Sequence, residues 1–125
     1  MYNAEQSGRQ KKVAELIKHS LANIFARKRG LHINLITNNI TITNVKMSSD
    51  LKYAHCYFLP FTGSNLDAES LLSALSLSRH AIRQQVTEAV KLKYSPDIRF
   101  YHDLGAENAM EVESTLTKLS LSDHA

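Results

Sequence analysis

One long helical pattern that runs directly into a short strand constrains this fold more than any other feature of the sequence. Residues 67–94 carry helical periodicity, and Pro96 ends it just before the β-rich segment DIRFYH at 97–102. Such a helix is long for a chain of 125 residues, and its serines are weak helix formers. We therefore expect a break or kink near Ser76–His80, giving two helices that lead into a strand.

These two helices have predictable ends and buried faces. Asn65 and Asp67 are both candidate N-caps for the first helix. The second helix is expected to bury its apolar side chains, which are Ile82, Val86, Ala89 and Val90. The strand that follows is expected to point Ile98 and Phe100 into the core.

A β-hairpin is predicted ahead of the helices. Residues 40–47, ITITNVKM, are rich in β-branched side chains, and their alternation slips near Asn44, which predicts a β-bulge. A turn at 48–50 leads to a second strand over 51–61. The less polar face of that strand is assigned to the core, with Ala54, Cys56 and Phe58 on it and Tyr53, His55 and Tyr57 on the other face.

An amphipathic helix is predicted over residues 9–28, with Ser7 as its N-cap and Gly30 at its end. Its apolar stripe comprises Val13, Ile17, Leu21 and Ile24, widened by Leu16 and Phe25. Residues 31–39 fit either a loop or the ragged entry to a strand. The predicted order is α-β-β-α-α-β, an α+β fold whose three-stranded sheet is covered by helices on one face.

Composition favours a single intracellular domain without covalent staples. The chain has one cysteine, Cys56, which excludes an intrachain disulfide. No apolar run approaches the length of a membrane span, and the N-terminus lacks the apolar region of a secretory signal. We therefore expect a cytoplasmic protein that does not enter a membrane.

Catalytic, metal-binding and cofactor chemistry is not expected. His55 and Cys56 are neighbours in a strand, so they point to opposite faces and cannot pair as base and nucleophile. The six histidines show no ligand spacing, and no Gly-rich phosphate loop is present. We predict no enzyme activity, no metal site, no cofactor and no small-molecule substrate.

Charge is distributed unevenly along the chain. Residues 1–30 hold seven Lys or Arg against two Glu, residues 79–102 hold five against two acidic residues, and residues 103–125 hold one against five. Two basic segments and an acidic tail give a polarised field that suits a polyanionic partner. Surface charge that merely maintains solubility explains the same pattern equally well.

Two groups of residues are candidates for contact with nucleic acid. Arg79, His80 and Arg83 lie within about one turn at the start of the second of the paired helices, where cations and backbone N–H groups suit phosphate. They fit a solvated helix surface equally well. Tyr53, His55 and Tyr57 could stack on bases, although β-propensity alone favours aromatic residues there.

Two motifs resemble those of the bacterial ribosome-binding factor A family, over roughly residues 9–103. The hairpin carries V-x-M-S-x-D-L-x-x-A as Val45, Met47, Ser48, Asp50, Leu51 and Ala54. The helix-to-strand run carries I-R…L-x-x-x-P-x-[IL]-x-F as Ile82, Arg83, Leu92, Pro96, Ile98 and Phe100. At the helix kink that family usually has a three-residue step of the form small-x-Gly. This chain has Ser78-Arg79-His80 at that step, so histidine replaces the glycine.

The resemblance implies a type II KH-like fold without the GXXG loop, and a non-enzymatic assembly factor. Such a factor would bind the free small (30S) ribosomal subunit as a monomer and assist its late maturation and 16S rRNA processing. The residues then expected to contact rRNA are Arg79, His80, Arg83, Lys91, Lys93 and Arg99, supported by Lys11, Lys12 and Lys18 on the first helix.

The residue patterns and the extent of the resemblance together predict a division of the chain. Residues 1–8 are expected to be a flexible N-terminus, residues 9–104 the KH-like domain, and residues 105–125 an acidic tail able to form a helix through Met110, Val112, Leu116 and Leu119. Two other functions stay open at this point. One is a generic single-strand RNA binder that uses the Tyr53 and Tyr57 face, and the other is a protein-interaction adaptor that uses the acidic tail.

Overall fold

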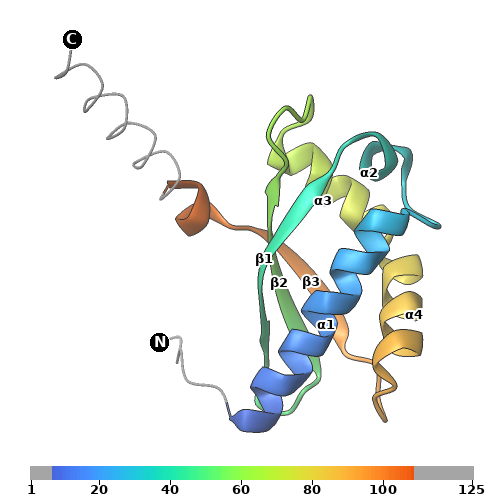
Figure 1. Cartoon of the computed structure of the whole chain (residues 1–125), viewed down its shortest axis with the longest axis vertical. Helices are drawn as coiled ribbons and strands as arrows, with labels where there is room; N and C mark the ends of the chain where they lie inside the picture. The colour runs from blue at the N-terminus through green and yellow to red at the C-terminus, as the bar shows by residue number, and fades with distance from the viewer. Residues whose placement is uncertain (1–6, 109–125) are drawn as a thin grey trace, which may run out of the picture.

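A three-stranded mixed sheet organises the computed structural model, which describes residues 7–108 (Figure 1). Strand β1 (Ile40–Met47) pairs antiparallel with β2 (Tyr53–Pro60), and β2 pairs parallel with β3 (Asp97–His102). The strand order β1-β2-β3 places β2 at the centre. The connection from β2 to the parallel β3 is made by a pair of helices, as the sequence predicts.

Helices cover one face of this sheet and leave the other open (Figure 1). The elements in chain order are α1 (Gly8–Arg27), α2 (Ile33–Thr37), the β1–β2 hairpin, α3 (Ala68–Leu77), α4 (Arg79–Val90) and β3. The predicted α-β-β-α-α-β order is confirmed, with the short α2 added. No helix among residues 7–108 is long and apolar enough to span a bilayer.

The core lies between the helices and the inner face of the sheet. Ala54, Cys56 and Phe58 of β2 are fully buried, which confirms the predicted inner face, and Ile98 is buried beside them on β3. The α1 stripe Val13, Ile17, Leu21 and Ile24 is also buried, together with Phe25. The register of β1 shifts between Ile42 and Asn44, so the predicted bulge is present.

Two side chains predicted to be buried are exposed. Leu16 is 46% exposed because Ala14 and Phe25 widen the α1 stripe on one flank, whereas Leu16 lies on the other. Ala89 is exposed because the last turn of α4 leads out into a loop whose Lys91 and Lys93 are in solvent. Both errors concern the edges of a buried stripe, where periodicity alone does not say which flank is covered.

Helix α1 begins as predicted, but its end and the segment that follows it differ from the predictions. Ser7 caps α1 through a capping box with Gln10, as predicted. The helix ends at Lys28, which takes a left-handed conformation (φ 62°), rather than at Gly30. Residues 31–39 contain α2 instead of a loop or strand entry, because the His32 ring accepts the Asn34 N–H and Leu35 is buried.

Candidate nucleic-acid interface

A groove of about 1120 Å³ runs between α4 and the hairpin turn. Its walls come from the start of α1, the β1–β2 turn, α4 and the α4–β3 loop. Five cationic side chains line it against two carboxylates; the cations are Arg9, Lys52, Arg79, Arg83 and Lys93, and the carboxylates are Asp50 and Asp97. We call this surface the basic groove.

The junction between α3 and α4 presents Arg79 and His80 to the basic groove. Both side chains are exposed in the first turn of α4. The predicted break falls at Ser78, whose backbone lies at φ −93° and ψ 0° between the two helices, and Asp67 rather than Asn65 caps α3. The kink therefore lies just before two exposed side chains that line the groove.

The kink is held by a side-chain hydrogen bond. The backbone N–H of His32 donates to the Ser78 hydroxyl at 2.8 Å, and Ser78 is only 3% exposed. His80, at the position where the sequence resemblance implies glycine, is helical and does not have a positive φ. Histidine at this position thus needs no strained backbone. The hydroxyl of Ser78 also links the kink to the start of α2 by accepting the His32 N–H.

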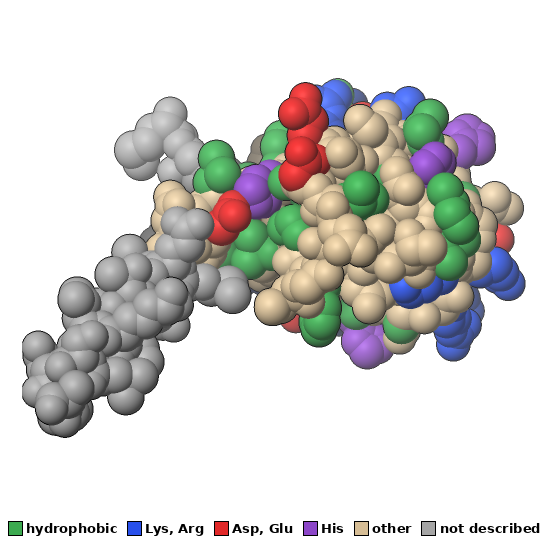
Figure 2. All heavy atoms as spheres, turned by 90° about the horizontal axis from the view of Figure 1, so that it is seen from above, with side chains coloured by type: hydrophobic (Ala, Val, Ile, Leu, Met, Phe, Trp, Pro, Cys, Tyr) green, Lys and Arg blue, Asp and Glu red, His purple; other side chains and the backbone are tan. Residues whose placement is uncertain are grey.

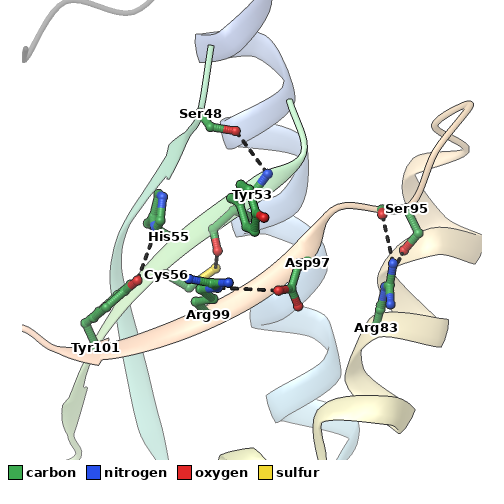
Figure 3. Close-up of polar contacts among 10 residues, drawn as sticks. Ser48, Tyr53, His55, Cys56, Arg83, Ser95, Asp97, Arg99 and Tyr101 are labelled. Atoms are coloured by element: carbon green, nitrogen blue, oxygen red, sulfur yellow. Dashed lines mark hydrogen bonds and ion pairs between the residues drawn. The ribbon is translucent and has the colours of Figure 1, made fainter. Parts of the chain in front are cut away.

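Arg83 has a structural contact as well as a place in the basic groove. Its Nε donates to the Ser95 hydroxyl at 3.1 Å, and its terminal nitrogen donates to the Ser95 carbonyl at 3.1 Å (Figure 3). The guanidinium therefore holds the α4–β3 loop against α4. It reaches this position already oriented, with its remaining N–H groups available to a phosphate.

The α4–β3 loop places only one of its two lysines in the groove. Lys93 lines the groove and lies 5.5 Å from the ring centroid of Tyr94, which is 77% exposed. Lys91 ends α4 in a left-handed conformation (φ 54°) and is not among the lining residues. Lys91 is thus a helix-ending residue whose charge lies beside the groove.

The other predicted contact residues lie outside the basic groove. Lys11, Lys12 and Lys18 are on α1 but do not line it. Arg99 lies on the open face of the sheet, 4.6 Å from the Tyr53 ring centroid and 3.4 Å from Asp97 (Figure 3). The sequence reasoning missed Arg9 and Lys52, because only the fold brings the start of α1 and the hairpin turn beside α4.

The carboxylates of the groove are already engaged within the protein. The Ser48 hydroxyl and the Lys52 backbone N–H donate to Asp50, and these bonds hold the pKa of Asp50 below its usual range. Asp97 faces Arg99. In contrast, no ion pair within residues 7–108 holds Arg79, Lys52 or Lys93, so these cations are available to an external anion.

Positive charge is not spread over the whole molecule. Figure 2 looks onto the end that carries α2 and shows mostly uncharged side chains and backbone there, with Lys and Arg side chains toward the rim. The centre of this end therefore offers little positive charge to an anionic partner.

The surroundings of Cys56 indicate a core residue rather than a nucleophile. Burial raises the pKa of the Cys56 thiol to about 12, and its sulfur lies 3.8 Å from the Ala54 carbonyl. A thiol of that pKa carries almost no thiolate at neutral pH and is a poor nucleophile. Among residues 7–108, no cluster of three or more His, Cys, Asp or Glu could hold a metal ion.

Comparison with known proteins assigns the fold and the family. The family model described as ribosome-binding factor A matches residues 9–116. Ribosome-binding factor A of Rickettsia prowazekii (strain Madrid E) is 40% identical over 117 residues, covering 94% of this chain and 91% of the relative.

Two known structures, one of them a fitted homology model, show the same fold at low identity. The crystal structure of ribosome-binding factor A from Thermus thermophilus aligns with a TM-score of 0.59 at 19% identity, covering 74% of this chain and 94% of that one. A homology model of the Thermus thermophilus factor, fitted into the cryo-EM map of its 30S complex, aligns with a TM-score of 0.52 at 15% identity and covers 78% and 93%. The type II KH-like fold expected from the sequence is confirmed.

Proposed function

The chain belongs to the ribosome-binding factor A family, and on that premise we propose that it binds the free small ribosomal subunit and assists late maturation of its 16S rRNA. Family membership also bears out the expectation that it is not an enzyme. It acts in the cytoplasm as a monomer, with residues 9–104 as the binding domain and residues 105–125 as an acidic tail.

The observation that carries this proposal is the basic groove at the α3–α4 kink. Its cations outnumber its carboxylates by five to two, and both carboxylates already have partners within the protein. An rRNA backbone offers a line of phosphates that such a groove can contact at several points. Because the groove needs neither a metal nor a nucleophile for this task, it binds its ligand without changing it.

The groove residues have different roles in this binding. Arg79 and Lys93 are solvent-exposed and supply charge that no ion pair within residues 7–108 engages. Arg83 is pre-oriented by Ser95, so less conformational entropy is lost when it meets a phosphate. His80 adds a polar side chain beside Arg79. Lys91, Lys11, Lys12 and Lys18 contribute long-range attraction from outside the groove.

Sedimentation of cell lysates tests the function itself. In a low-salt gradient, the protein should travel with the small-subunit fraction and should leave it as salt is raised, because phosphate contacts weaken with salt. Consistent absence from that fraction at low salt would refute the proposal.

A pair of arginine variants tests the site. Arg79→Gln removes an unpaired groove cation and should weaken subunit binding without changing the melting temperature. Arg27→Gln, an exposed arginine in the last turn of α1 outside the groove, is the matched control and should bind as the wild type does. Equal binding by the two variants would show that the groove is not the contact surface. Arg83 is a poorer choice because its replacement also releases Ser95.

A further inference from the structure

The open face of the sheet carries aromatic and cationic side chains from all three strands. Tyr53, His55 and Tyr57 of β2 point to this face, since Ala54, Cys56 and Phe58 point to the core. Strand pairing places Tyr101 of β3 beside Tyr57. Tyr53 and Tyr101 are 38% and 37% exposed, so both rings present surface to solvent.

The four rings form one continuous run, which we call the aromatic strip (Tyr53, His55, Tyr57 and Tyr101). Ring centroids are 6.4 Å apart for Tyr53 and His55, 5.6 Å for His55 and Tyr101, and 5.3 Å for Tyr101 and Tyr57. His55 Nδ1 and the Tyr101 hydroxyl lie 3.0 Å apart and tie the two strands on this face (Figure 3). The strip is therefore ordered before any ligand arrives.

A row of basic side chains crosses the sheet through the strip. Lys46 of β1 pairs in register with His55, and His55 pairs with Arg99 of β3, so the three lie side by side on the open face. The Arg99 guanidinium lies 4.6 Å from the Tyr53 ring centroid. Arg99 also pairs with Asp97, but both side chains are partly exposed and such ion pairs are weak. Arg99 can therefore exchange its contact with Asp97 for one with a phosphate.

We propose that this open face is a second RNA-contact surface, which stacks unpaired bases on the aromatic strip and takes their phosphates on the Lys46–His55–Arg99 row. Aromatic faces stack with any base, and neighbouring cations track the backbone of a single strand. Duplex RNA cannot use the strip because its bases are already stacked on one another. The inference rests on the proposed function, since it names the single-stranded part of the rRNA as the ligand of a surface distinct from the basic groove.

The chemistry of the face favours RNA over a protein partner. The centre of a protein-binding surface is usually apolar. Here the central row across the strands is Lys46, His55 and Arg99, and the adjacent row is Asn44, Tyr57 and Tyr101. Tyr53 lines the basic groove as well as belonging to the strip, so one RNA chain can pass from the groove to the open face without leaving the protein.

The test measures binding of a labelled, unstructured oligoadenylate to the full chain and to three variants. Tyr101→Thr removes a ring but keeps β-propensity, and should weaken binding about tenfold or more. Tyr101→Phe keeps the ring and should bind within about twofold of the wild type. Leu104→Thr changes an exposed apolar side chain just beyond β3 and is the control for surface change alone.

Each outcome bears on one proposal. Tighter binding of oligoadenylate than of an RNA duplex of equal length, lost with Tyr101→Thr, supports the aromatic strip. Unchanged oligoadenylate binding by Tyr101→Thr overturns it, and so does loss of subunit binding with oligoadenylate binding intact, which would indicate a protein ligand. Wild-type protein that stays off the small subunit refutes the proposed function, whereas failure at the strip with normal subunit binding leaves that function standing.

Discussion

Replacing Ser78 by alanine should destabilise the domain, even though alanine is also a small residue. The substitution removes only the hydroxyl oxygen, so packing at the kink changes little. It takes away the acceptor of the His32 N–H, a bond of 2.8 Å that joins the start of α2 to the junction between α3 and α4. The backbone donor is then left without its partner in a partly buried site.

The expected loss follows from that donor. Leaving a buried donor unsatisfied costs about 1–3 kcal/mol, and partial exposure of His32 places this case near the lower end. Alanine is the better helix former, but by no more than about 0.5 kcal/mol, and Ser78 lies between two helices rather than inside one. The net loss should be about 1 kcal/mol in the free energy of unfolding, or a melting temperature lower by about 4–8 °C.

Urea and thermal unfolding followed by circular dichroism measure this difference. Ser76→Ala is the matched control, because Ser76 is exposed on α3 only two residues away. It should leave the free energy of unfolding unchanged or raise it slightly. If Ser78→Ala is as stable as Ser76→Ala, the hydroxyl does not hold the kink and serine does not compensate there for the missing glycine.

Three further results are expected. Lys91→Gly should raise the free energy of unfolding by about 0.5–1 kcal/mol in urea melts, because glycine adopts the left-handed backbone without strain, whereas Lys91→Ala should not. Cys56 should react with thiol reagents only as fast as the domain unfolds, since burial raises its pKa to about 12; fast reaction in the native state would contradict this. Hydrogen bonds from the Thr43 hydroxyl and the Ala106 N–H lower the pKa of Asp103 from 3.8, so its carboxylate stabilises the fold above that pH and loses this effect as pH falls. The stability gap between wild type and Asp103→Asn should therefore shrink as the pH falls below 3.8, and a constant gap in melts across pH would refute the assignment.

Hydrophobic periodicity, together with the residues that break or end helices and strands, was sufficient to predict the architecture. The alternation in β2, the bulge near Asn44, the break at Ser78 and the bounds of β3 all depend on local patterns, and the structure confirms them. The short α2 could not be predicted this way. Its five residues are too few to show helical periodicity, and it forms because the His32 side chain caps it.

The grouping of residues in the basic groove was predictable only where they are close in sequence. Arg79, His80 and Arg83 share one turn, and the structure places all three in the basic groove. Arg9 and Lys52 join them across the fold, and no local pattern marks residues that meet only through tertiary packing. For the same reason, the bond from Arg83 to Ser95 was not foreseen. The helix expected from Met110 to Leu119 lies outside the described residues.

The salt dependence of binding to purified small subunits tests the central claim most directly. The variant that combines Arg79→Gln with Lys93→Gln should bind more weakly than wild type, and its plot of log affinity against log salt should be shallower by about 1 for each phosphate that the groove no longer neutralises. The Arg27→Gln control should keep the wild-type affinity and slope. If the double variant and the control give the same affinity and slope, the basic groove does not contact the rRNA.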